Sequence, residues 1–262
     1  MQRISRQLFA TGMIGLGILG LVYGDFALQW QPVPVSIPGR ADFAYACAVL
    51  MLLSGIGLLW RRSAGYSTVV LLAYLLLWLL WLKVPRVVMR PRVEGNWLGF
   101  GEIAVLTAGA WALFGSLGPG WTSTRLNAVA GRNGVRIARY LFGAALIPVG
   151  LSHFVYASET ASLVPAWLPY RLDWAYLAGA GHLAAGVGVI LGVYLRLAAT
   201  LEAAMLTVFT VLVWIPAVVA APTTRLPWTA LLISWAISTG AWVVAGALAE
   251  KGAVTRSARI PA

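Results

Sequence analysis

Eight long apolar segments, separated by short polar stretches, dominate this sequence. A helix needs about 20 mostly apolar residues to cross the hydrocarbon core of a bilayer. Hydrophobic residues make up 60% of the chain and charged residues only 10%, against roughly 25% charged in water-soluble domains. The sequence therefore predicts an all-α, multi-pass membrane protein. Its eight transmembrane helices are expected near residues 8–23, 43–60, 67–82, 97–113, 140–156, 174–194, 197–215 and 228–248.

The two halves of the chain resemble each other residue by residue. Matches between them run at an offset of 133 positions and, after a two-residue gap, at an offset of 131. Chance similarity of apolar segments does not keep arginine, aspartate, proline and tryptophan in register. Each repeat has four helices, an even number, so we expect two parallel four-helix bundles related by an axis along the membrane normal. Matched pairs include Arg6/Arg139, Pro38/Pro169, Asp42/Asp173, Pro85/Pro216 and Trp97/Trp228.

This duplication predicts the organisation of the chain. We expect a degenerate first repeat at 1–115, a linker at 116–136, a second repeat at 137–248 and a tail at 249–262. The basic and then apolar N-terminal segment could pass for a secretory signal peptide. Because it recurs as a helix in the second half, we expect it to belong to the fold.

The basic residues predict the orientation and the partners of the chain. Net charge is +11, and the basic residues fall almost entirely between the apolar segments. That placement indicates topology signals and contact with anionic lipid headgroups, and it argues against nucleic acid as a partner. Twelve Lys and Arg residues fall on the face that carries both termini and seven on the other. Both termini are therefore expected to be cytoplasmic.

Several kinds of chemistry lack the residues they need. Cys47 is the only cysteine, so dithiol–disulfide exchange within the chain has no resolving partner. With two histidines and one cysteine, no metal site is expected. No cofactor is evident from the residues themselves.

Four ionisable residues fall inside predicted helices, where such groups are costly and often functional. Counting about 1.5 Å per residue places Glu102, His153 and His182 in the outer half of the membrane. We expect these three to line a polar pocket, because a carboxylate beside an imidazole can stabilise its cation and pass a proton to a bound quinone or anion. Glu202 falls near the inner face and is expected to stay isolated, pairing with Arg196 or reaching the interface.

The remaining wall of this pocket is predicted to be aromatic, from Tyr156, Tyr176 and Trp167. The alternative reading is that each histidine only donates one hydrogen bond to a neighbouring helix. In the first repeat His153 corresponds to Gly20 and His182 to Met51. Any polar site is therefore expected in the second half, with the first half serving as scaffold.

The second half also resembles a known family. The pattern R-x-x-x-G-x-x-x-x-x-x-G-x-x-H-F at Arg139–Phe154 is followed by VPAWLP, an Asp-Trp helix start and a glycine-rich helix with His182. This is similar to the DoxX/DoxD-like membrane proteins, which are four-helix bundles found mainly in bacteria. Residues 137–248 carry the resemblance well, and 4–113 carry it weakly.

The resemblance implies a role without supplying catalytic residues. Some members of the family are similar to small membrane subunits of thiosulfate:quinone oxidoreductases, and others are associated with oxidative-stress complexes. It implies an accessory or quinone-interacting subunit of a redox system in the bacterial plasma membrane, with a bound quinone and a redox partner protein. A small-molecule transporter and a lipid-binding or scaffold protein without catalysis are the alternatives.

Overall fold

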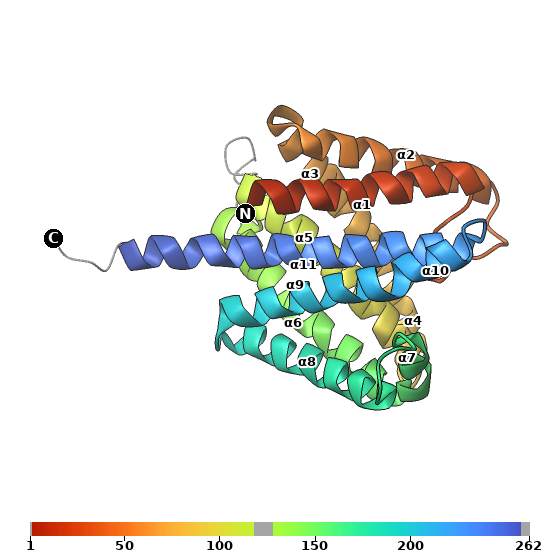
Figure 1. The fold of residues 1–262 in the computed structure, drawn as a ribbon. Helices are drawn as coiled ribbons and strands as arrows, with labels where there is room; N and C mark the ends of the chain where they lie inside the picture. Colours follow the sequence, from red (N-terminus) through yellow and green to blue (C-terminus); the bar gives the residue numbers. More distant parts are fainter. Residues whose placement is uncertain (1, 118–127, 258–262) are drawn as a thin grey trace.

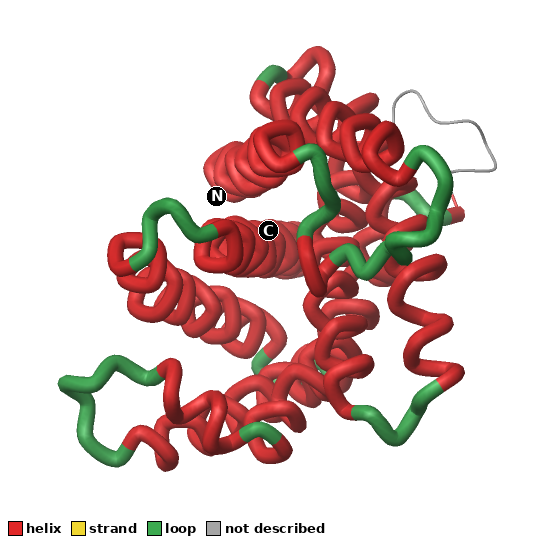
Figure 2. The backbone as a smooth tube through the Cα atoms, turned by 90° about the vertical axis from the view of Figure 1, so that its right-hand side faces the viewer, coloured by secondary structure: helices red, strands yellow, loops and turns green. Residues whose placement is uncertain are grey.

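The computed structural model describes residues 2–117 and 128–257, with side chains described up to Ala249. Within these residues the chain forms helices and loops only (Figure 2). Eight helices are long and apolar enough to cross a membrane, which confirms the predicted all-α architecture of eight spans. The elements are α1 (Gln2–Tyr23), η1 (Leu28–Trp30), α2 (Arg40–Leu59), α3 (Arg61–Leu77), η2 (Trp78–Lys83), α4 (Val84–Met89), α5 (Glu94–Leu117), α6 (Gly131–Val155), α7 (Ala157–Leu163), α8 (Arg171–Leu191), α9 (Leu195–Phe209), η4 (Thr210–Trp214), α10 (Ile215–Ala220) and α11 (Arg225–Ser257).

Two spans continue past the points where the sequence placed their ends. The third was expected to stop at Leu82 and the seventh at Ile215, yet α3–η2–α4 and α9–η4–α10 run on to Met89 and Ala220. Proline has no N–H and clashes with the carbonyl four residues back, so it disrupts a regular α-helix. Here a wide π turn precedes each proline, with its closing N–H bonded five residues back, and the helix continues beyond it.

Helices extend into both segments that the sequence places outside the two repeats. Helix α5 continues to Leu117 and α6 begins at Gly131, so residues 131–136 of the predicted linker are helical. Residues 118–127 of that linker lie outside the described part of the chain. The predicted tail begins inside α11, which continues to Ser257; residues 258–262 are not described.

Helices α5 and α11 form the centre of the bundle. They are the most buried spans, and they pack against each other where Gly109 meets Gly240. A Cβ on Gly109 would lie 2.8 Å from the Gly240 Cα, so the two backbones are in direct contact. Helix α1 packs on α2 and α11, and α6 packs on α5 and α8. Figure 1 shows α1 and α2 on one flank of this centre and α8 and α9 on the other.

A charged cluster joins the two halves at the end of the bundle opposite the start of α1. Asp25, in the loop after α1, accepts a hydrogen bond from Arg40 and another at 3.0 Å from Arg225 of α11. Burial raises the pKa of Asp25, but the hydrogen bonds from Arg225, from the Phe26 N–H and from Arg40 outweigh it and lower the pKa overall. The loop 24–39 is thereby tied to the start of α11.

Candidate functional site

A cavity of about 680 Å³ lies mainly among helices of the second half, α6, α7, α8, α9–η4 and α11, and is also lined by Trp30 and α5 of the first half. Its volume is in the range of small-molecule sites, and most of its lining is apolar, as such sites usually are. The polar side chains that line it are few, and they come from four of the spanning helices and from α7. They are Glu102, Ser152, His153, Thr160, His182 and Ser234.

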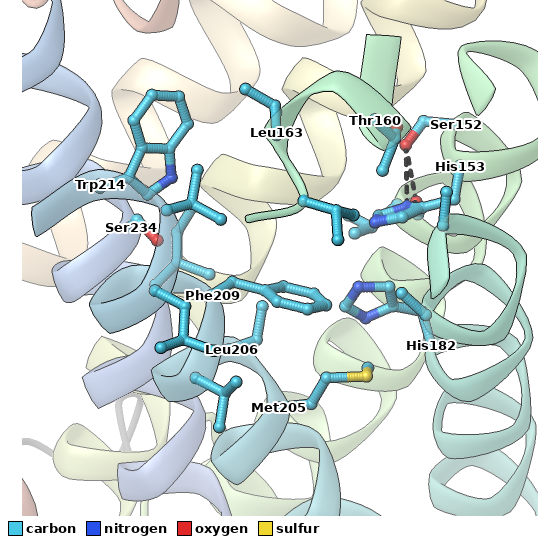
Figure 3. Close-up of a pocket in the computed structure, with 18 of the residues that line it drawn as sticks. Ser152, His153, Thr160, Leu163, His182, Met205, Leu206, Phe209, Trp214 and Ser234 are labelled. Carbon is cyan, nitrogen blue, oxygen red and sulfur yellow. Dashed lines mark hydrogen bonds between the residues drawn. The ribbon is translucent and has the colours of Figure 1, made fainter. Parts of the chain in front are cut away.

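The two histidines meet on one wall of this cavity. His153 comes from α6 and His182 from α8, and their ring centroids are 4.9 Å apart with the planes tilted by 51°. Phe209, at the end of α9, contacts both rings at centroid distances of 6.3 and 6.0 Å. Figure 3 shows the rings of Phe209 and His182 pointing toward one another. Both histidines thus line one cavity.

His153 has a defined tautomer. Its Nδ1 lies 2.8 Å from the backbone carbonyl oxygen of Val149, one turn earlier in α6. A carbonyl can only accept, so Nδ1 carries the hydrogen and, in the neutral ring, Nε2 carries a free lone pair. No described residue hydrogen-bonds to this Nε2. His153 therefore offers the cavity an acceptor.

His182 is paired with Glu202, which corrects the expectation that this glutamate is isolated. Nδ1 of His182 lies 2.7 Å from Glu202 Oε1, and the two side chains are 1% and 0% exposed. Arg196, the partner considered for Glu202, instead donates to the carbonyl of Ala249. The depth estimate failed because α8 begins at Arg171, three residues before the assumed start, so His182 lies deeper.

The tight turn between α8 and α9 sets the heights of His182 and Glu202 relative to each other, which counting from the predicted helix ends did not give. Helix α8 ends at Leu191 and α9 begins at Leu195, so the two helices are antiparallel neighbours. His182 lies nine residues before the end of α8 and Glu202 seven residues after the start of α9. At about 1.5 Å per residue, the two side chains sit at nearly the same height.

Burial limits the charge that this pair can carry. Glu202 Oε2 is buried without a hydrogen-bond partner, and an isolated carboxylate in an apolar interior is strongly unfavourable. A net-neutral pair is either an imidazolium beside a carboxylate or a neutral histidine beside a carboxylic acid. In both arrangements Nδ1 faces Glu202, and Nε2 carries a hydrogen. His182 therefore offers the cavity a donor, next to the acceptor of His153.

Glu102 lies on α5. It lines the same space as the histidines, and no hydrogen bond in the described part of the chain joins it to either of them. The charge that acts on its carboxyl is that of Lys83. Lys83 was expected in a loop, but the continued third span buries it at 5% exposure, where its Nζ donates to the Gln29 carbonyl at 3.3 Å.

Of the three aromatic residues expected in the wall, one lines the cavity and two lie elsewhere. Trp167 lines the cavity. Tyr156 follows the last residue of α6, and its hydroxyl accepts the N–H of Gly95 at 3.1 Å. Tyr176 stacks on Phe154, with centroids 5.7 Å apart, outside the cavity lining. It precedes His182 by six residues, which at about 100° per residue places it on a different face of α8.

Sequence reasoning missed the part of the site contributed by α9. Met205, Phe209 and Leu212 line the cavity and follow Glu202 by three, seven and ten positions. Residues at that spacing lie on one face of a helix. Listing the residues on the same helix face as Glu202 would therefore have identified them. Thr210 and Ser234 share a hydrogen bond of 2.8 Å beside the same space.

The cavity opens between α8 and α9. Leu177 of α8 and Val208 of α9 both line it, yet they are 61% and 48% exposed. Trp167, at 72% exposure, lies at the same opening. The two helices meet at their turn and separate toward α7 (Figure 1). Because both helices are apolar spans, this opening faces the position that lipid would occupy.

The corresponding space in the first half is filled. Gly20 and Met51, the counterparts of the two histidines, border a void of only about 10 Å³. Trp78, the counterpart of Phe209, donates from its indole to the Trp30 carbonyl at 2.7 Å. Gln31 donates to the Tyr74 hydroxyl at 2.5 Å. The loop 24–39 thus inserts side chains where the second half keeps a cavity.

Comparison with known proteins gives one match. A family model described as a domain of unknown function (DUF8561) matches residues 142–240. This region contains His153, His182, Glu202 and Phe209, and it leaves out Glu102. No curated protein and no solved structure matches the chain.

Proposed function

We propose that this chain binds a lipophilic, quinone-type molecule in the cavity beside His153 and His182, as an accessory subunit of a membrane redox system. The observation that carries the proposal is the pairing of a donor and an acceptor on one wall of an otherwise apolar cavity. A quinone or quinol has this chemistry, with oxygen atoms on a flat ring and an apolar tail. The opening between α8 and α9 suits a ligand that arrives from the bilayer.

The His182–Glu202 pair is suited to exchange one proton with such a ligand. Nε2–H of His182 can donate to a carbonyl oxygen of the ring, and Nε2 of His153 can accept from a hydroxyl. The chain has one cysteine and so cannot supply electrons through a dithiol. Electrons would come from a partner protein, in keeping with the resemblance to quinone-linked DoxX-like subunits.

The scaffold proposed for this site is a fused pair of DoxX-like four-helix repeats lying parallel in a bacterial plasma membrane, with both termini cytoplasmic. Two features recur at an offset of 131 and support this. The first is the π turn, which precedes Pro85 in one half and Pro216 in the other. The other is the indole of Trp97, which donates to the Pro91 carbonyl at 2.8 Å, as Trp228 does to Pro222 at 2.7 Å.

Quenching of tryptophan fluorescence tests the proposed binding. Trp167, Trp174 and Trp214 line the cavity, and quinones quench indole emission on contact. We expect saturable quenching of the purified protein in nanodiscs by a short-chain ubiquinone or menaquinone analogue. The variant His182→Met places at this position the residue that the first half has at Met51. We expect it to weaken binding roughly tenfold, the effect of losing one hydrogen bond to a charged or polarised group.

The outcome that contradicts the proposal is equally specific. Quenching that rises linearly with quinone, without saturation, would show collision in the bilayer instead of a site. Saturable quenching that is unchanged in both His182→Met and His153→Leu would place the ligand elsewhere.

A transporter of small apolar or anionic solutes is the second candidate. The π turn and Pro216 interrupt the span that lines the cavity, and interrupted helices often border transport sites. The close contact of Gly109 with Gly240 gives the two halves little freedom to rock against each other. Counterflow of labelled solute in proteoliposomes would favour transport, and its absence alongside quinone binding would favour the accessory role.

A further inference from the structure

We propose a second site, independent of the cavity, that binds a phosphate-type oxyanion at the end of the bundle where α1 begins. It consists of Arg6 and Arg3 of α1 and the N-terminus of α3 at Arg61. The chemistry fits the phosphate of an anionic lipid headgroup or a free phosphate ion.

Arg6 is the central observation. Its side chain is buried, with 6% of the residue exposed, and its Nε has no hydrogen-bond partner. The charges that act on it are those of Arg3 and Arg61, both cations. None of the three forms an ion pair with a described residue. Burying one guanidinium among others is unfavourable unless an anion joins them.

The matching arginine of the second half shows what Arg6 lacks. Arg139 donates from Nε to the Val189 carbonyl at 2.7 Å and from its terminal nitrogen to the Ile190 carbonyl at 2.9 Å, at the end of α8. Beside it lies Gly192, whose added Cβ would be 2.8 Å from that guanidinium. The residue of the first half that corresponds to Gly192, at the offset of 131, is Arg61. A single arginine that caps a helix is thus replaced by adjacent positive charges.

The start of α3 adds donors to these charges. Helix α3 runs from Arg61 to Leu77, and no side chain caps its first N–H groups. Uncapped N–H groups at a helix N-terminus, together with the helix dipole, favour an anion. The Ser63 hydroxyl, which could have served as a cap, donates instead to the Gly57 carbonyl at 2.7 Å. An oxyanion at this point would meet N–H groups and guanidinium groups together.

The experiment compares Arg6→Gln with Arg139→Gln, a control in which the arginine already has protein partners. Thermal unfolding of the purified full chain is followed in phosphatidylcholine nanodiscs, in nanodiscs with added phosphatidylglycerol, and in phosphatidylcholine with inorganic phosphate. We expect wild type and Arg139→Gln to gain thermal stability from the anion, and Arg6→Gln to lose that gain. Binding of the anionic lipid, measured by native mass spectrometry, should weaken roughly tenfold in Arg6→Gln.

Each arm has a defined reading. If only phosphatidylglycerol raises the thermal stability of wild type, the ligand is a lipid headgroup. If inorganic phosphate raises it as well, the site binds phosphate groups in general. An equal response of Arg6→Gln and wild type, or no response of wild type to either anion, overturns the proposal. Should Arg6→Gln fail to fold, Arg61→Gln changes an exposed member of the same site and must show the same loss. Quinone binding should be unaffected by either variant, which separates this test from that of the cavity.

Discussion

At the scale of single residues, the His182–Glu202 pair carries most of the chemistry of the site. We expect Glu202→Gln to stay within about 1 kcal/mol of wild type, because an amide can still hydrogen-bond to Nδ1 of His182 in a neutral pair. Glu202→Leu leaves Nδ1 buried without a partner and should cost about 1–3 kcal/mol. Thermal unfolding in one detergent measures both. Equal stability of the two variants would contradict a buried hydrogen bond.

Asp25 gives a prediction that depends on pH. Its pKa in the folded chain lies below the ordinary value of 3.8. Ionised Asp25 therefore stabilises the folded state at pH values above its ordinary pKa. This contribution is lost as pH falls below about 4 toward the lowered pKa. The difference in melting temperature between wild type and Asp25→Asn should be present at pH 7 and shrink below pH 4. A difference that does not change with pH would contradict the role of its charge.

Sequence alone located the histidines but not their partner. Ionisable residues inside apolar segments stand out, and helix geometry gives their depth once the ends are known. The pairing with Glu202 was missed because the start of α8 was assigned to Trp174, while the helix begins at Arg171, so His182 lies deeper than expected. Tyr156 was placed in the pocket as if α6 continued, although the helix stops at Val155. Errors of a few residues at helix ends thus changed which side chains meet.

At the scale of elements, the contact between α5 and α11 should be the least tolerant of added volume. A methyl group on Gly109 would lie 2.8 Å from the Gly240 Cα, and neither backbone can move aside without separating two central helices. Overpacking of this kind costs about 1–3 kcal/mol, so Gly109→Ala should lower thermal stability markedly. Gly246→Ala, also in α11, is the control, because its added methyl would meet nothing closer than 3.7 Å. Similar melting temperatures for the two variants would show that the helices are not in close contact.

The apolar segments predicted the existence of all eight spans, and prolines caused the errors in their lengths. Pro85 and Pro216 read as helix ends because a regular α-helix does not accommodate them. The π turns before them have no distinctive composition, so the continuation to Met89 and Ala220 could not be read from the residues. This continuation also buries Lys83, which was expected in a loop, where its charge acts on Glu102.

At the scale of the whole molecule, the two ends of the bundle should lie on opposite sides of the membrane. In a Cys47→Ala background, we expect Ser36→Cys, in the loop 24–39, to react with a membrane-impermeant thiol reagent in intact cells. Arg62→Cys, at the turn between α2 and α3, should react only after the cells are permeabilised. Labelling in the reverse pattern would contradict cytoplasmic termini.

The two halves of this molecule differ in what lies between their helices. In the first half Met51 borders a void of only about 10 Å³ that Phe26 and Gln31 also line, and in the second half a cavity of about 680 Å³ lies beside His182. The residues that recur hold helices together, and the residues that differ define the site. Sequence comparison of the halves predicted this asymmetry, whereas the filling of the first half by a loop became visible only in three dimensions.

Photolabelling with an azido-quinone analogue tests the central claim most directly. After illumination of the protein in nanodiscs, peptide mass spectrometry locates the label. The account predicts that labelling falls within 163–182 and 205–213, that unlabelled quinone competes for it, and that His182→Met reduces it. Competable labelling within 1–80, or labelling that is unaffected by His182→Met and His153→Leu together, would contradict a quinone site beside the two histidines.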